Sequence, residues 1–142
     1  MMEISLKQGS VRDLKTACIA VAVFAGKRLS PSAYALDKAS RGALGRVIKR
    51  GDITGTLGES LLLPDVTGIG AERVLLVGAG KADGILGAEY LTLLGKTAKS
   101  IADAGFKSAT STLGEIEVKD HEAKWKARQA VVAFRMAAYR FD

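Results

Sequence analysis

The segment Cys18–Phe24 reads CIAVAVF, and the segment Arg73–Gly78 reads RVLLVG. Both are short runs rich in valine, isoleucine and leucine, and the first carries no charge at all. Strands that are covered on both faces have this composition, because neither side can present polar groups to water. The two segments therefore predict buried strands in a sheet with helices on both sides.

The residues that follow the first of these strands favour a helix. Ser30-Pro31 predicts its start, because the serine oxygen can accept an unpaired backbone N–H and proline is tolerated at the first helical position. The helical character extends over Ser32–Arg50. Glycine weakens a helix by about 1 kcal/mol relative to alanine. We therefore expect an interruption near Gly42 or Gly45.

Two more helices are predicted nearer the carboxyl end. Apolar residues recur at helical spacing over Ala88–Ala104, after a glycine-rich turn over Gly78–Gly87, and Gly105 is placed to end this helix in the left-handed conformation. Asp120 can cap a last helix. The predicted apolar stripe of that helix consists of Ala123, Ala127, Val131, Phe134 and Ala138.

Weaker strand patterns complete the sequence, and no repeat or linker divides its 142 residues. These candidate strands are Met2–Leu6 at an edge, Ser60–Leu63 closed by Pro64, Phe106–Ser111 and Glu115–Val118. Uncharged strands that alternate with amphipathic helices predict helices on both faces of a largely parallel sheet. We expect one domain of the α/β class, over residues 1–142.

The composition excludes several classes of protein. An apolar share of 48% and a charged share of 25% are those of a globular chain. The single Cys18 and the single His121 exclude disulfide scaffolds and zinc fingers. The longest uncharged apolar run, Ala17–Ala25, is far shorter than the roughly 20 residues of a membrane helix. We expect a protein of the cytoplasm, with no membrane partner.

The net charge of +6 is concentrated in one segment. Between residues 27 and 50 there are seven cations and one carboxylate, so this basic block accounts for the whole excess. Such a block is either a solvated surface or a contact for an anionic partner such as nucleic acid, or for another subunit. Its cations are Lys27, Arg28, Lys38, Arg41, Arg46, Lys49 and Arg50.

No motif in the sequence predicts catalysis. Gly78-Ala79-Gly80-Lys81 lies between a strand and a helix, but its spacing fits neither the dinucleotide fingerprint nor the phosphate-binding loop of nucleotide hydrolases. Cys18 lies in an apolar strand, where burial raises the thiol pKa and makes the thiol inert. His121 lies in a polar turn without a second metal ligand or a nucleophile beside it. We assign no catalytic, metal or cofactor-binding residue.

Several strings, in order along nearly the whole chain, resemble the amino-terminal domain of the leucyl (cytosol) aminopeptidases. They are LSP (29–31), ALDKAS (35–40), GAL (42–44), GESLLLP (58–64), RVLLVG (73–78) and AYRFD (138–142). The resemblance implies a three-layer α/β/α sandwich with a mixed, largely parallel sheet, similar to a macrodomain.

The resemblance also implies a larger protein. In the family a carboxy-terminal peptidase domain holds two divalent metal ions (zinc, manganese or magnesium), which activate the water that attacks the amino-terminal peptide bond. Family members form homohexamers. The residues of the metal centre are absent from this chain, so we expect a fragment of a longer enzyme that is inactive alone and has an assembly or regulatory role.

Two alternatives remain open. Some bacterial members of the family bind DNA, and the basic block could contact phosphates without sequence choice. The fold analogy also permits a free-standing macro-like domain that binds ADP-ribose, with its phosphates near Gly78–Gly84 at the start of the following helix.

Overall fold

The structure is a computed structural model that describes residues 3–6 and 10–141, the last three of them as backbone only. The strands of the described chain are β1 (Glu3–Leu6), β2 (Ile19–Phe24), β3 (Arg28–Leu29), β4 (Ser60–Leu63), β5 (Val74–Gly78) and β6 (Ser108–Ser111). The helices are α1 (Pro31–Ala39), α2 (Ala43–Lys49), α3 (Gly87–Asp103), the short 3₁₀ helix η1 (Leu113–Glu115) and α4 (Ala123–Phe141).

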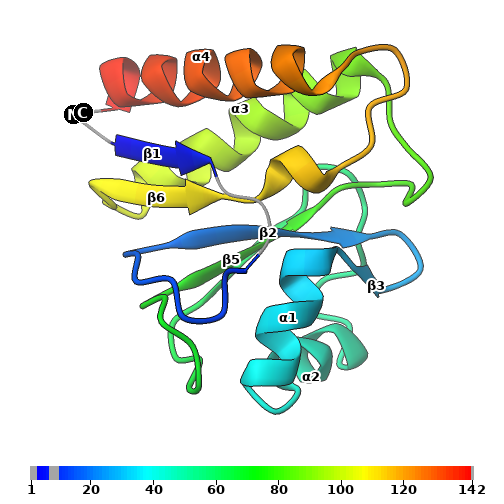
Figure 1. Cartoon of the computed structure of the whole chain (residues 1–142), viewed down its shortest axis with the longest axis vertical. Helices are drawn as coiled ribbons and strands as arrows, with labels where there is room; N and C mark the ends of the chain where they lie inside the picture. Colours follow the sequence, from blue (N-terminus) through cyan, green and yellow to red (C-terminus); the bar gives the residue numbers. More distant parts are fainter. Residues whose placement is uncertain (1–2, 7–9, 142) are drawn as a thin grey trace.

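The sheet is mixed and largely parallel, as the sequence predicts (Figure 1). Its strand order is β1-β6-β2-β5-β4, and β3 pairs with the end of β2. The strands β1, β6, β2 and β5 run parallel to one another, whereas β3 and β4 are antiparallel to their partners. The two strands that the sequence marks as buried, β2 and β5, are neighbours at the centre.

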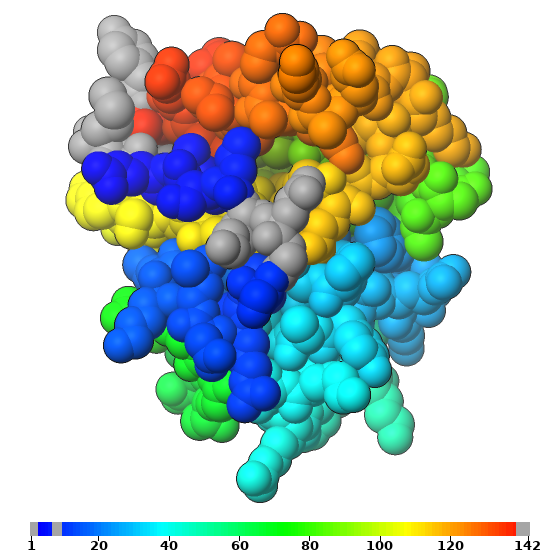
Figure 2. Space-filling model, in the orientation of Figure 1, coloured from blue at the N-terminus to red at the C-terminus, as the bar shows by residue number. Residues whose placement is uncertain are grey.

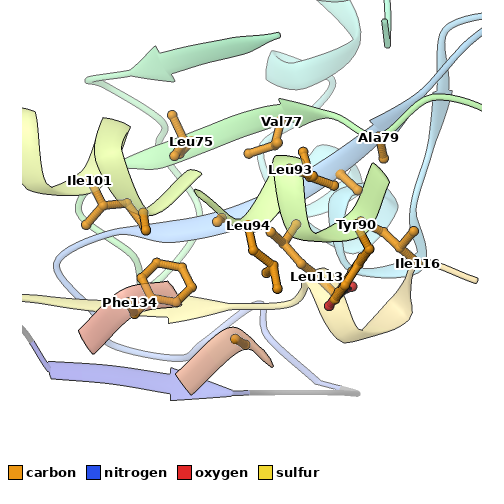
Figure 3. Packing of buried hydrophobic residues seen from close by; sticks show 14 of the residues in the cluster. Leu75, Val77, Ala79, Tyr90, Leu93, Leu94, Ile101, Leu113, Ile116 and Phe134 are labelled. Atoms are coloured by element: carbon orange, nitrogen blue, oxygen red, sulfur yellow. Dashed lines mark hydrogen bonds between the residues drawn. The ribbon is translucent and has the colours of Figure 1, made fainter. Parts of the chain in front are cut away.

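Helices α3 and α4 cover one face of the sheet and α1 and α2 cover the other, which gives three layers (Figure 1). Strand β2 is buried along its whole length and its side chains alternate between two cores. Ala20 and Ala22 pack on the α3–α4 side, whereas Ile19 and Val21 pack on the α1–α2 side. Figure 3 shows the first of these cores, where residues of α3, α4, β5 and η1 meet.

The first helical region is broken in two, as predicted. The Ser30 hydroxyl oxygen accepts a hydrogen bond from the backbone N–H of Ala33 over 3.2 Å, so Ser30 caps α1. Gly42 has a φ of +87°, which L side chains rarely adopt, and it separates α1 from α2. The interruption is therefore at Gly42, while Gly45 lies inside α2.

Two of the weaker strand predictions need correction. The segment Glu115–Val118 is not a strand: its first residue ends η1, and its last makes a single parallel bridge to Ile85. The predicted strand Phe106–Ser111 is shorter at its start, because a turn that includes Gly105 (φ +83°) precedes β6. Strand β4 and helix α3 lie within one residue of their predicted bounds.

The predicted cap of the last helix is wrong. Helix α4 begins at Ala123, and the Asp120 carboxylate instead accepts a hydrogen bond from the backbone N–H of Gly87 over 2.7 Å. Asp120 therefore caps α3, which begins 33 residues earlier in the sequence. This contact joins the start of one helix to the loop before the next.

The predicted apolar stripe of α4 is right only in part. Phe134 and Ala138 are buried, whereas Ala123 and Ala127 are exposed and Val131 is half-buried. Helix α4 packs against α3 as well as against the sheet. The face of α4 that is buried is therefore rotated about the helix axis relative to the predicted apolar face. The buried residues of the described side chains are Ala130, Phe134, Ala137 and Ala138.

Strand β1 is the edge strand that the sequence predicts, observed from Glu3 onward. Met2 and Asp142, which the predicted strand and the last family string include, lie outside the described residues. Among the described helices, none combines the length and apolar character that a membrane crossing requires.

Candidate functional site

The carboxyl ends of parallel strands are the usual place for a ligand in an open α/β sheet. In this chain β2, β5 and β6 end at Phe24, Gly78 and Ser111. Helix α3 begins beyond this edge, and η1 follows β6 there. This edge is therefore the first candidate site.

A loop from the β4 side closes over the ends of β2 and β5. The backbone N–H of Gly80 donates to the Gly55 carbonyl over 2.9 Å, and the N–H of Ala25 donates to the Gly80 carbonyl over 2.8 Å. A Cβ atom at Gly55 would collide with the carbonyl of Phe24, so glycine is required for this approach. The backbone groups at these strand ends are thus paired with the chain itself.

The amino terminus of α1 is occupied by a carboxylate of the chain. Glu115 accepts a hydrogen bond from the backbone N–H of Ser32 over 3.0 Å and a second from the Ser32 hydroxyl over 2.6 Å. Ser32 is buried, and Glu115 lies 83 residues away at the end of η1. A helix amino terminus is where a free anion would bind. Here Glu115 takes that position.

A second carboxylate fills a cradle of backbone N–H groups in the loop before β4. One oxygen of Glu59 accepts hydrogen bonds from the N–H groups of Thr54, Gly55 and Thr56 over 3.1, 2.8 and 2.7 Å, and from the Thr54 hydroxyl over 3.0 Å. Partial burial opposes ionisation of Glu59, but these hydrogen bonds outweigh it and hold its pKa below the usual value. The loop thus contains its own anion.

The amino terminus of α3, where the sequence places the phosphates of the alternative ligand, is filled as well. Glu89 accepts from the N–H of Leu86 over 2.9 Å, and Asp120 accepts from the N–H of Gly87. A shallow cavity of about 320 Å³ lies beside this turn, lined by Gly80, Lys81, Gly84, Ile85, Leu86, Glu89 and Lys119. Of its two lysines, Lys119 lies 4.0 Å from the Asp83 carboxylate.

Sequence reasoning missed these carboxylate contacts to different degrees. Glu89 stands at the third position of α3, which is a recognisable capping pattern. Glu115 and Asp120 carry no comparable local pattern, because their partners lie 83 and 33 residues away.

Cys18 is buried, as predicted, and burial raises the pKa of its thiol to about 11. His121 is exposed in a turn, also as predicted. Its ring stacks on Trp125 with the centroids 3.6 Å apart and an angle of 8° between the planes, a contact that the sequence did not predict. Among the described residues, no three His, Cys, Asp or Glu side chains gather as a metal site would need.

The basic block is exposed at every one of its seven cations, but they are spread over several elements. Lys27 lies in the turn between β2 and β3 and Arg28 begins β3, whereas Lys38 lies on α1 and Arg46 and Lys49 lie on α2. Arg46 reaches back to the carbonyl of Arg41 over 2.8 Å. Figure 2 shows the α1–α2 segment (cyan) at the opposite end of the molecule from α4 (orange to red).

Two other cations of the block have local partners. Arg50 forms an ion pair with Asp52 over 3.0 Å, and the Lys38 ammonium lies 5.5 Å from the centre of the Tyr34 ring. Lys49 is exposed on α2. The helical face that the sequence predicts for Arg46, Lys49 and Arg50 is therefore open to solvent, although Arg50 is partly neutralised.

Comparison with known proteins identifies the family. Residues 20–142 match the model of the cytosol aminopeptidase family, N-terminal domain. The chain belongs to the cytosol aminopeptidase family. A probable cytosol aminopeptidase of Xylella fastidiosa (strain M23) is 41% identical over 140 residues, which cover 99% of this chain and 28% of that protein. One from Vibrio campbellii (strain ATCC BAA-1116) is 43% identical over 141 residues, again 28% of its length. The chain thus spans less than a third of the length of the relatives that it matches.

Solved structures confirm the fold class. The macrodomain of Mycobacterium tuberculosis DarG superposes with a TM-score of 0.70 at 15% identity, over 96% of this chain and 92% of that one. A mutant of tomato leucine aminopeptidase gives a TM-score of 0.63 at 19% identity, over 94% of this chain and 28% of that one. The chain therefore has the macro-like α/β fold that its sequence predicts.

Proposed function

We propose that this chain is the non-catalytic amino-terminal domain of a cytosol aminopeptidase, with an assembly or regulatory role beside a carboxy-terminal peptidase domain. The observation that carries the proposal is the match of residues 20–142 to the N-terminal domain of the family. The chain covers only 28% of the length of its relatives, which supports the proposal that a separate peptidase domain makes up the rest of the parent protein.

The parent enzyme would remove amino-terminal residues from peptides in the cytoplasm, as a homohexamer with two divalent ions of zinc, manganese or magnesium. The described residues of this chain do not fit such a metal centre, because they bring together no group of three potential ligands. We therefore place the metals and the catalytic groups in the peptidase domain and derive no catalytic step from this one.

The test is an activity assay on the purified chain with leucine anilide, with and without added manganese or zinc. We expect no turnover above buffer under either condition. A full-length relative, such as the probable cytosol aminopeptidase of Vibrio campbellii, serves as the positive control. Metal-dependent turnover by the 142-residue chain that a chelator abolishes would contradict the proposal.

A contact with DNA through the basic block is the second candidate, favoured by the exposure of all seven of its cations. We expect weak binding whose log affinity falls linearly with log salt concentration. Changing Arg46, Lys49 and Arg50 to glutamate should weaken it. The matched control makes the same change at the exposed α4 residues Lys124, Arg128 and Arg135. No band shift at low salt, or an equal effect of both triple variants, would count against this candidate.

The structure disfavours the ADP-ribose alternative, because carboxylates already occupy the N–H groups that phosphates would use. Glu115 is hydrogen-bonded at the start of α1, and Glu89 and Asp120 at the start of α3. A diphosphate would have to displace these groups and approach their negative charge. We expect titration calorimetry with ADP-ribose to give no heat of binding.

A further inference from the structure

A groove of about 580 Å³ runs between α3 and α4 on the outer side of that helical layer. Its walls are mainly apolar, and three large side chains stand exposed in it: Leu91 at 45%, Val132 at 49% and Met136 at 63%. Scattered exposed apolar residues need no explanation, but three that meet in one groove indicate a binding surface. The complete lining is Leu91, Thr92, Gly95, Lys96, Lys99, Gln129, Val132, Ala133, Met136 and Ala137.

Gly95 lies in the middle of α3 and lines the groove. Glycine in the middle of a helix costs about 1 kcal/mol relative to alanine. Apart from the neighbouring backbone of α3 itself, no described atom lies within 4 Å of the place where a Cβ of residue 95 would stand, so the packing of the described domain does not require glycine there. The missing side chain matters to an occupant of the groove, because it lets another backbone approach α3 closely.

The positive charge around the groove favours an occupant with acidic groups. Within the sequence of α4 there are five cations and no carboxylate. Of these, Arg128 and Arg135 are exposed and adjoin the lining residues Gln129 and Met136. On the α3 side Lys96 and Lys99 line the groove, and Lys99 pairs with Asp103 over 2.7 Å. An occupant with acidic groups beside an apolar stripe would complement both features.

We propose that the groove between α3 and α4 binds an amphipathic helix of a partner protein, one that carries acidic side chains beside its apolar stripe. Two side-by-side helices with an apolar floor form the receptor of a common recognition mode, in which the guest helix anchors residues at i, i+3, i+4 and i+7. The proposal does not depend on whether a peptidase domain follows this chain.

A second copy of this chain is a poor occupant. Its four α-helices are neutral or basic: α1 and α3 carry equal numbers of acidic and basic residues, and α2 and α4 carry cations alone. A copy that offered α4 would bring like charges together, which destabilises an interface. A second copy of this chain is therefore not the expected occupant.

The experiment titrates the ¹⁵N-labelled 142-residue chain with a synthetic helix of about four turns, with leucine at the anchor positions and glutamate at the flanking ones. A control peptide has lysine in place of glutamate. We expect saturable shifts of the backbone amides of Gly95 and Val132, weaker binding at high salt, and no binding of the lysine peptide.

Three variants locate the site. Met136→Lys should weaken binding by about tenfold or more, since it places a charge on the apolar floor. Gly95→Leu should weaken it similarly while it preserves or raises the thermal stability of the domain, because leucine favours the helix. Tyr34→Lys, on the exposed face of α1, is the matched control and should leave binding unchanged.

Several outcomes would overturn the proposal. They are the absence of saturable shifts, shifts centred outside α3 and α4, equal binding of the lysine peptide, and unchanged affinity in Gly95→Leu. Binding to anionic phospholipid vesicles without binding to the peptide would assign the groove to a membrane surface instead. Dimerisation in sedimentation analysis that Gly95→Leu abolishes would assign it to a second copy.

Discussion

At the scale of single residues, Glu115 links two elements that are remote in the sequence. Its two hydrogen bonds to Ser32 join η1, on one side of the sheet, to the start of α1 on the other. Replacement by alanine leaves a buried hydroxyl and a helix N–H without their charged acceptor. We expect Glu115→Ala to lower the free energy of unfolding by about 1.5–3 kcal/mol in urea denaturation.

The matched control for that variant is Glu117→Ala, two residues further on, where the side chain is exposed. It should change the free energy of unfolding by less than about 0.5 kcal/mol. If the two variants are equally stable, the contact with Ser32 does not have the role that its geometry indicates.

Glu59 makes the stability of the fold depend on pH. Its folded-state pKa lies below the usual value of 4.5, so the ionised carboxylate stabilises the fold above that pH, and the contribution is lost as pH falls through the folded-state pKa. We expect the stability difference between the wild type and Glu59→Gln, measured by urea midpoints, to be present at neutral pH and to shrink in acid. A difference that stays constant over this range would refute the assignment.

At the scale of elements, the cap of α3 can be tested directly. Asp120 caps the backbone N–H of Gly87 across the gap between two helices. We expect Asp120→Ala to lower the free energy of unfolding by about 1 kcal/mol, the typical cost of a lost helix cap. Glu122→Ala, in the same exposed turn, is the control. Hydrogen exchange should show faster opening of the first turn of α3 in Asp120→Ala, and not of α4.

Some elements and caps have a local sequence signal, and others do not. Strand β4 and the cap of α1 by Ser30 were predictable, because a bounded apolar run and a serine–proline pair act locally. The pairing of Asp120 and the turn at Glu115 were not, because each depends on a partner remote in sequence. The stripe of α4 was misplaced since helical periodicity fixes an apolar face but not the second helix that packs beside it.

The candidate site was likewise predictable only in part. From the sequence, the glycine-rich turn after β5 was only an alternative place for the phosphates of a ligand, and the cations between residues 27 and 50 were a candidate contact surface. The sequence did not predict that Glu59 and Glu115 fill the neighbouring N–H cradles, because a carboxylate gives no local sign of the donors it will meet. Burial of Cys18 was predictable because its neighbours are uniformly apolar.

At the scale of the whole molecule, Cys18 reports on global unfolding. It is fully buried beside the central strand β2, and burial holds its thiol pKa at about 11. We expect a thiol reagent at neutral pH to label the native chain at least about a thousandfold more slowly than the urea-unfolded chain. Rapid labelling of the native protein would mean that the sheet opens locally near β2.

The alternation of side chains along β2 has an evolutionary consequence. The residues that point toward α3 and α4 are mostly small, whereas those that point toward α1 and α2 are branched at Cβ. Random mutagenesis of this strand should therefore yield survivors with opposite biases at successive codons: enlargement is penalised at Ala20 and Ala22, and shortening at Ile19 and Val21.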